Sequence, residues 1–175
     1  MSKFLNNYWY VAANSEELKD KPIARIILGN PIVLFRGKSG KIGALDDRCA
    51  HRLTPLSLGR IDGDQLECGY HGWTYDCAGK CVRLPGLETP QKITVKSFPL
   101  VEKWGWVFIW MGDPDKADNN TLPDFHVMGE DKWVGDGGML RVEAHCDLIR
   151  DNLLDLTHAK YTHKQTLATE DVDRV

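Results

Sequence analysis

The sequence has no long apolar run. The longest stretch, Val107 to Met111, is far too short to cross a bilayer. The first residues, MSKFLNNYWYVAANSEEL, also lack a basic segment followed by an uninterrupted apolar run, which a secretory leader would need. We therefore expect a cytoplasmic protein with no membrane partner.

The chain also has no excess or clustering of basic residues. It contains 22 Lys and Arg against 25 Asp and Glu, and its net charge is -3. A nucleic-acid-binding surface normally gathers lysine and arginine on one face, so nucleic acid is excluded as a partner. There is no internal repeat or low-complexity tract, and 175 residues with 42% hydrophobic content are enough to bury a core.

The cysteines do not form an even set of the kind that a disulfide framework uses. There are five, and only Cys49 and Cys68 belong to motifs that also contain histidine. Cys77 and Cys81 flank the turn-like AGK, so we interpret them as strand residues, and Cys146 has no assigned role. A reducing compartment with metal chemistry explains this usage better than disulfides do.

Short apolar or alternating segments follow one another from Tyr8 to about Met111, and the spacers between them contain Gly, Asn, Asp or Pro. These are typical of strands joined by tight turns, so this part is expected to be a small antiparallel β unit. The expected strands are YWYVA, IARIIL, PIVLFR, IGALD, ITVKSF and WVFIW.

The pattern changes at Gly112 to Asp124, a polar stretch without apolar periodicity that we interpret as an inter-domain connection. A short strand is expected at MLRVEAH. The segment CDLIRDNLLDLTHAKYTHK then spaces its leucines at helical intervals without Gly or Pro, so it predicts a helix. We expect one domain over 1–115, and a linker with the start of a second domain over 116–175.

Two separated pairs of metal-binding residues lie in the first domain, within RCAHRLTPLSLGRIDGDQLECGYHGW. Cys49 precedes His51 by two positions, and Cys68 precedes His71 by three. Zinc accepts two sulfurs and two nitrogens, but zinc fingers usually place cysteine with cysteine and histidine with histidine. A two-iron cluster fits mixed pairs better, because one iron can take both cysteines and the other both histidines. Neutral imidazoles also raise the reduction potential, so this ligand set indicates electron transfer.

CAHR followed by CGYHGW, with the intervening AHRLTPLSLG, resembles the Rieske 2Fe-2S domain. The resemblance implies an antiparallel β-sandwich in which Gly69 and Gly72 let the backbone turn around the cluster. LPG at Leu84 to Gly86 resembles a further loop over such clusters. Trp73 is either a shield for the cluster or an ordinary core aromatic residue.

A second set of metal-binding residues occurs in RDNLLDLTHAKYTH. Asp155 and His158 are three apart and would share one helical face, whereas His163 is five beyond His158 and points elsewhere on a straight helix. If both histidines bind one metal, the helix must end or deform near Ala159 to Tyr161.

This string resembles the mononuclear iron motif of Rieske non-haem iron oxygenases. The resemblance implies that His158 and His163 hold a mononuclear Fe(II) as two arms of a two-histidine, one-carboxylate triad. It also implies that Asp155 is a bridging acid between His158 and a cluster histidine such as His71 of a neighbouring subunit in a homotrimer. Asn152 is given a supporting role.

The opening YWYVAANSEEL and CAHRLTPLSLG most resemble the monooxygenase branch that includes vanillate O-demethylase oxygenase components. The resemblance implies a second domain of α+β type with a metal-binding helix. It further implies electrons from NAD(P)H through a reductase or ferredoxin, O2, and hydroxylation or O-demethylation of a small aromatic substrate. Two alternatives stay open: a Rieske ferredoxin-like electron carrier without catalytic iron, and a zinc-stabilised binding module.

The family pattern continues for about as many residues again, so we expect this chain to be an N-terminal fragment that lacks the carboxylate ligand. The acidic residues near the end, Glu170, Asp171 and Asp173, are expected to be solvated, not to bind iron. His126 and His145 are expected to be surface or packing histidines.

Overall fold

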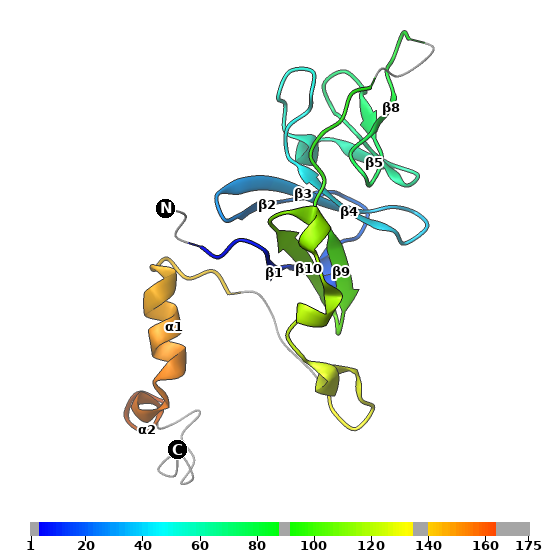
Figure 1. Cartoon of the computed structure of the whole chain (residues 1–175). Helices are drawn as coiled ribbons and strands as arrows, with labels where there is room; N and C mark the ends of the chain where they lie inside the picture. Colours follow the sequence, from blue (N-terminus) through cyan, green and yellow to red (C-terminus); the bar gives the residue numbers. More distant parts are fainter. Residues whose placement is uncertain (1–3, 88–91, 135–139, 164–175) are drawn as a thin grey trace. The chain divides into compact units, whose positions relative to one another are not determined.

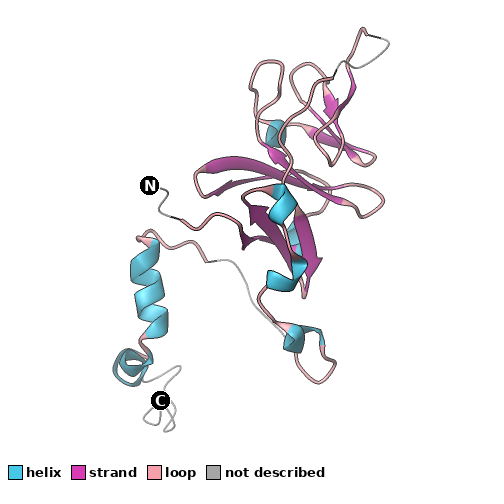
Figure 2. Ribbon diagram, in the orientation of Figure 1, coloured by secondary structure: helices cyan, strands magenta, loops and turns pink. Residues whose placement is uncertain are grey.

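The computed structural model describes residues 4–87, 92–134 and 140–163. The chain divides into two compact units, Met1–Val134 and Gly135–Val175, which are described separately below. The first unit is built from three antiparallel sheets, and the second contains helices (Figures 1 and 2). The mainly β, antiparallel fold expected from the sequence is confirmed.

The first sheet joins the beginning of the unit to its later part. Its order is β1 (Tyr8–Asn14), β10 (Trp106–Met111) and β9 (Leu100–Lys103), so two segments almost a hundred residues apart in the chain pair directly. β10 is the apolar run WVFIWM, which is nearly all buried because it is the central strand.

The second sheet runs β2 (Ile23–Ile27), β3 (Asn30–Arg36) and β4 (Ile42–Asp46). Successive side chains of a strand point to opposite faces, so β3 contributes to two separate cores. Ile32 and Leu34 pack with residues of β1 and β10, whereas Val33 and Phe35 pack around the two cysteines of the paired motifs. This explains why PIVLFR reads as a continuous apolar run, because both of its faces are covered.

The third sheet carries the second of the paired motifs. Its strands are very short. They lie side by side in the same order as in the sequence: β5 (Arg60–Asp62), β6 (Gln65–Glu67), β7 (Thr74–Tyr75) and β8 (Cys81–Arg83). One face of this sheet covers a core that includes Leu66, Tyr75 and Cys81, all fully buried. The sequence pattern had not indicated β5, β6 or β9. Of the two cysteines interpreted as strand residues, Cys81 lies in β8, whereas Cys77 lies in the turn before it.

Two of the expected strands are absent. Residues 93–98 make only isolated bridges, Lys80 with Thr94 and Leu45 with Ser97, although backbone hydrogen bonds still tie this segment to its neighbours. Residues 140–145 contain no strand in the described part of the expected segment. Their side chains are exposed, and none of the described strands pairs with this segment.

Short 3-10 helices punctuate the first unit: η1 (Ser15–Glu17), η2 (Leu56–Leu58), η3 (Pro114–Lys116), η4 (Asn119–Thr121) and η5 (His126–Gly129). The last three lie in and after the polar stretch that the sequence marks as a connection. Asp113 and Asp118 cap η3 and η4 by accepting hydrogen bonds from the backbone N–H two residues on, at 3.2 and 2.9 Å.

The second unit contains α1 (Cys146–Leu154), η6 (Leu156–His158) and α2 (Ala159–Thr162). The sequence predicts a helix here, and the structure divides it into these three pieces. Asp155 leaves the helical conformation, with φ -91° and ψ 89°, so the chain turns between α1 and η6. No described helix is long and apolar enough to span a bilayer.

Candidate functional site

The first ligand loop, residues 47–57, brings Cys49 and His51 to one end of the third sheet. The Cys49 N–H donates to the Thr54 carbonyl at 2.9 Å, and the Leu53 N–H donates to the Cys49 carbonyl at 2.8 Å. At the base of the loop, the buried Asp47 carboxylate accepts from the Ser57 N–H at 2.7 Å and from its hydroxyl at 2.6 Å. These bonds close the loop around the two candidate ligands.

The second ligand loop, residues 68–73, has a similar closure. The Cys68 N–H donates to the Trp73 carbonyl at 2.8 Å, and the Gly72 N–H donates to the Cys68 carbonyl at 3.0 Å. Gly72 has φ +72°, a conformation that favours glycine, and a side chain on Gly69 would come within 2.9 Å of the Leu58 carbonyl oxygen. Both glycines of CGYHGW are therefore required by the backbone, as expected.

The two loops bring like residues together. The imidazole rings of His51 and His71 lie with centroids 4.5 Å apart and planes at 60°, and both residues are exposed. Cys49 and Cys68 are only 2% exposed and face the core. The site therefore has a buried side with two sulfurs and a surface side with two imidazoles.

The electrostatics of the cysteines follow from this burial. Desolvation raises the pKa of the Cys68 thiol, and the neighbouring Cys49 raises it further, while the backbone N–H groups of Tyr70 and His71 act in the opposite direction. Those two amides can therefore stabilise a thiolate at Cys68. Desolvation also lowers the pKa of the His51 imidazole, with the nearby His71 as a second cause.

The donor arrangement fits two metal ions better than one. One tetrahedral zinc would draw all four donors onto a single ion. Separate sulfur and imidazole sides suit a two-iron cluster, whose irons take different ligands.

Aromatic side chains surround these ligands. The Trp73 indole stacks on His51, with centroids 4.6 Å apart and planes at 5°, and Tyr70 lies 3.8 Å from His71 between centroids. The Tyr75 hydroxyl, fully buried, lies 3.3 Å from the Cys49 Sγ and accepts from the Ala50 N–H at 3.2 Å. Sequence reasoning missed Tyr75, because its contact with Cys49 joins residues 26 positions apart in the chain.

In the second unit, His158 and His163 lie close together in the segment that follows α1 and Asp155. Their ring centroids are 5.3 Å apart, with planes at 71°. Between the two histidines, the 3-10 turn η6 gives way to α2 at Ala159, and α2 ends at Thr162, so the helix changes near the expected positions. A further break, which the sequence did not indicate, precedes both histidines at Asp155. A straight helix would separate the two histidines around its axis. Asn152, the expected supporting residue, lies with its Nδ2 3.4 Å from the His158 Nε2.

Asp155 itself lies outside α1, so it does not share a helical face with His158 as expected. Its carboxylate caps η6 by accepting from the Thr157 N–H at 3.0 Å and from the Thr157 hydroxyl at 2.5 Å. These bonds lower the pKa of the Asp155 carboxyl. The contact that it makes with His158 is through its backbone carbonyl, which lies against the His158 Nδ1. Glu170, Asp171 and Asp173 lie outside the described residues.

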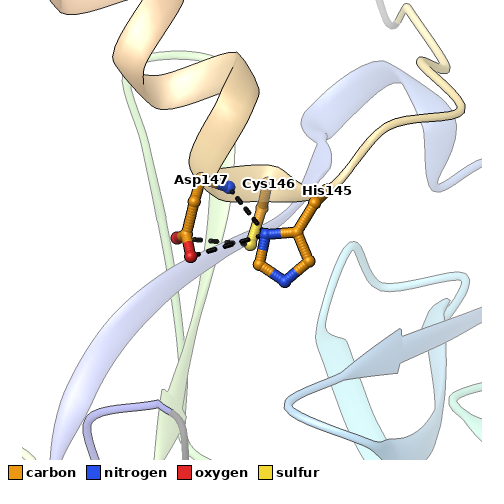
Figure 3. A group of neighbouring side chains, drawn as sticks. All are labelled: His145, Cys146 and Asp147. Atoms are coloured by element: carbon orange, nitrogen blue, oxygen red, sulfur yellow. Dashed lines mark hydrogen bonds and ion pairs between the residues drawn. The ribbon is translucent and has the colours of Figure 1, made fainter.

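The group at His145, Cys146 and Asp147 stands at the start of α1 (Figure 3). His145 is the N-cap residue, because its Nδ1 accepts from the Asp147 N–H at 3.3 Å. The Asp147 carboxylate pairs with Arg150 at 3.0 Å. These contacts are typical of a helix N-terminus. The other unassigned histidine, His126, is exposed and lies 2.9 Å from the Asp124 carboxylate, as expected for a surface histidine.

Comparison with known proteins agrees with this geometry. Residues 8–99 match the Rieske [2Fe-2S] domain family, and residues 142–175 match the vanillate O-demethylase oxygenase C-terminal domain. The first match covers more than half of the chain, and the chain belongs to the Rieske [2Fe-2S] domain family.

Within this family, the chain is similar to oxygenase components. It is 41% identical to the dicamba O-demethylase oxygenase component of Stenotrophomonas maltophilia, over 98% of this chain and 51% of that protein. It is 40% identical to a toluene-4-sulfonate monooxygenase iron-sulfur subunit of Comamonas testosteroni, over 95% of this chain and 49% of that protein. A crystal structure of dicamba monooxygenase bound to dicamba matches with a TM-score of 0.90 and 42% identity, over 98% of this chain and 52% of that one. The chain thus spans about half the length of these relatives.

Proposed function

We propose that this chain is part of the terminal oxygenase component of a Rieske-type aromatic oxygenase. The observation that carries the proposal is that one chain contains both a pair of converging cysteine–histidine loops and a second histidine pair at an interrupted helix. An electron carrier needs only the first of these. The similarity to oxygenase components over nearly the whole chain supports the same conclusion.

In this proposal, Cys49 and Cys68 hold one iron of a 2Fe-2S cluster, and His51 and His71 hold the other. When bound, such a cluster carries one electron at a time. The buried cysteines keep water from the sulfur side, while the exposed histidines give a donor protein access to the other side. The donor is a reductase or ferredoxin that draws on NAD(P)H. Trp73 supports His51 by stacking on it.

His158 and His163 are proposed to hold a mononuclear Fe(II), with Asn152 beside the first of them. Iron held by two histidines and a carboxylate keeps open positions at which O2 is activated. Asp155 holds η6 in place through Thr157, and as a carboxylate it is also proposed to link His158 to His71 of a neighbour in a homotrimer. The carboxylate ligand is proposed to come from outside the described residues.

The proposed reaction is hydroxylation or O-demethylation of a small aromatic compound. Dicamba, vanillate and toluene-4-sulfonate appear in the names of similar proteins, so they are the first substrates to test. The proposed division of the chain is a Rieske domain over 1–115 and the beginning of the catalytic domain over 116–175, and the proposed compartment is the cytoplasm.

Metal analysis tests the proposal. We expect two irons and two acid-labile sulfides per chain from the cluster, and a third iron where the mononuclear site is complete. Cys68→Ser should lose the sulfide, whereas His158→Ala should lose only the third iron. His126→Ala is the control, because His126 is an exposed histidine outside both sites and should change neither count.

A turnover assay separates the oxygenase from the electron carrier. With NAD(P)H, a suitable reductase and O2, we expect the hydroxylated or demethylated product to form with the three test compounds as a first panel. Two irons and two sulfides without a third iron, in protein of the full natural length, would instead establish the electron carrier. Zinc without sulfide would contradict both redox functions.

A further inference from the structure

Four side chains form a polar row across the third sheet, one from each strand. The strand register pairs Arg60 of β5 with Glu67 of β6, Glu67 with Thr74 of β7, and Thr74 with Arg83 of β8. Directly opposed residues of antiparallel strands lie on the same face of the sheet. The opposite face of the sheet carries Leu66 and Tyr75, which belong to the core below the cysteines.

The row is held together by ionic and hydrogen-bonding contacts. The two oxygens of the Glu67 carboxylate each pair with an arginine, Arg60 on one side and Arg83 on the other. Arg83 also reaches Asp62 at 3.0 Å, and its Nε donates to the Thr74 hydroxyl at 3.1 Å. The Glu67 side chain is only 9% exposed, so the arginines compensate a carboxylate that water scarcely reaches.

The row lies at the base of the second ligand loop. Glu67 directly precedes Cys68, and Thr74 directly follows Trp73, so the row flanks both ends of residues 68–73. The Thr74 hydroxyl donates to the Gly72 carbonyl at 3.0 Å, which extends the chain of contacts into the loop itself.

Backbone pairing alone gives this part of the sheet little rigidity. β7 has two residues, and its pairing with β8 is irregular between Thr74 and Tyr75. A ladder this short contributes few hydrogen bonds, so side-chain contacts across the strands carry a larger share of the local stability.

We propose that Arg60, Glu67, Thr74 and Arg83 are positioning residues for the cluster, which hold the Cys68–His71 loop in its ligating shape and set the local charge beside it. The inference rests on the proposed binding of the cluster by the paired motifs. The four residues touch neither metal nor substrate, and they act through the backbone at Cys68 and Gly72.

The geometric part of this proposal is tested at Thr74. Thr74→Val removes the hydroxyl but keeps the branched shape, whereas Thr74→Ser keeps the hydroxyl. We expect the valine variant to lose the visible absorbance of the cluster about tenfold faster than the wild-type protein, because a buried hydrogen-bonding group is left unpaired. The serine variant should stay within about twofold, the range of substitutions that break no contact.

The electrostatic part is tested by the reduction potential, measured by voltammetry of the cluster-loaded protein. Glu67→Gln removes a negative charge and leaves both arginines, so the potential should rise. Arg83→Gln removes a positive charge, so the potential should fall. Shifts of opposite sign are not expected from simple loss of packing. Glu17→Gln is the matched control, because Glu17 also pairs with an arginine, Arg25, but lies outside the third sheet. This variant should change neither the reduction potential nor the rate at which the cluster is lost.

The outcomes distinguish this inference from the proposed function. Wild-type protein without two irons and two sulfides would contradict the proposed function itself, and the inference with it. Wild-type protein that holds the cluster, with Thr74→Val as stable as Thr74→Ser or with both charge variants shifted in the same direction, would overturn only the positioning role. If Glu67→Gln does not fold, the comparison of Thr74→Val with Thr74→Ser and the sign of the Arg83→Gln shift decide.

Discussion

The indole ring of Trp73 lies parallel to the imidazole ring of His51, with centroids 4.6 Å apart and planes at 5°. The two residues come from different ligand loops, so the stack joins the loops at the surface side of the site. Tyr70 lies against His71 in a tilted arrangement. Each candidate histidine ligand therefore has an aromatic neighbour from the second loop.

Removal of the Trp73 ring should loosen His51. We expect Trp73→Ala to lose the cluster about two to ten times faster than the wild-type protein, because an aromatic pair contributes roughly 0.5–1.5 kcal/mol beyond its buried area. Trp73→Phe should lie between the two. The decay of visible absorbance at a fixed temperature measures this, with Trp133→Ala as the control, since Trp133 is exposed and outside both loops. If Trp73→Ala lost the cluster as slowly as the wild-type protein, this would contradict a role of Trp73 in supporting His51.

The Tyr75 hydroxyl should tune the reduction potential. Burial, followed by the neighbouring Cys49, raises the pKa of Tyr75, so the hydroxyl stays protonated and can donate to the Cys49 sulfur at 3.3 Å. Donation to sulfur favours the reduced cluster. Tyr75→Phe should therefore lower the potential by about 20–60 mV, the one-electron equivalent of roughly 0.5–1.5 kcal/mol. Tyr10→Phe, whose hydroxyl bonds the Leu5 carbonyl, is the control. A rise in the potential would contradict the assigned donor direction.

Two substitutions of Asp155 separate its roles as a cap and as a bridging carboxylate. Asparagine can still accept from the Thr157 N–H, whereas alanine cannot, and loss of such a cap costs about 1 kcal/mol. We expect Asp155→Ala to lower the content of mononuclear iron and Asp155→Asn to retain it. If the carboxylate also bridges to a neighbouring cluster, the asparagine variant should keep its iron but transfer electrons slowly in a single turnover. Equal iron contents in both variants would contradict the capping role.

The ion pair between Arg36 and Glu102 should make stability depend on pH. The two side chains meet in a bidentate contact at 2.6 and 2.9 Å, which lowers the pKa of the Glu102 carboxyl below its ordinary value of 4.5. A lowered folded-state pKa contributes stability that is present above the ordinary value and lost as the pH falls through the folded one.

Glu102→Gln should thus lower the thermal midpoint at pH 7 by roughly 2–4 °C, for a partly exposed pair worth about 1 kcal/mol. The difference from the wild-type protein should shrink on acidification below pH 4.5. Thermal melts followed by circular dichroism between acidic pH and pH 7 measure this difference in thermal midpoint. Glu16→Gln serves as the control, because Glu16 is an exposed residue of η1. A difference that grows at low pH would reverse the assigned sign.

Much of the first unit could be predicted from the sequence because its signals are local. Apolar runs bounded by turn residues indicated β1 to β4 and β10. The segment 93–98 was expected to be a strand and forms only isolated bridges, because a β-strand exists through its partners and no alternation pattern specifies them. The short strands β5, β6 and β9 were not recognised for the same reason.

The sequence by itself indicated which atoms could hold metal, since cysteine and histidine at these spacings are characteristic of metal ligands. It also indicated that one straight helix cannot bring Asp155, His158 and His163 together. Only the tertiary structure decided that sulfur and imidazole lie on opposite sides of one site and that α1 ends before Asp155. It also decided that Tyr75 lies against Cys49 and that the row from Arg60 to Arg83 lies at the base of the second ligand loop. The physical reason is that the ability to bind metal belongs to the individual side chain. The convergence of loops and the register of strands instead depend on contacts between residues distant in the chain. Where a helix ends depends on competition between alternative hydrogen-bond partners.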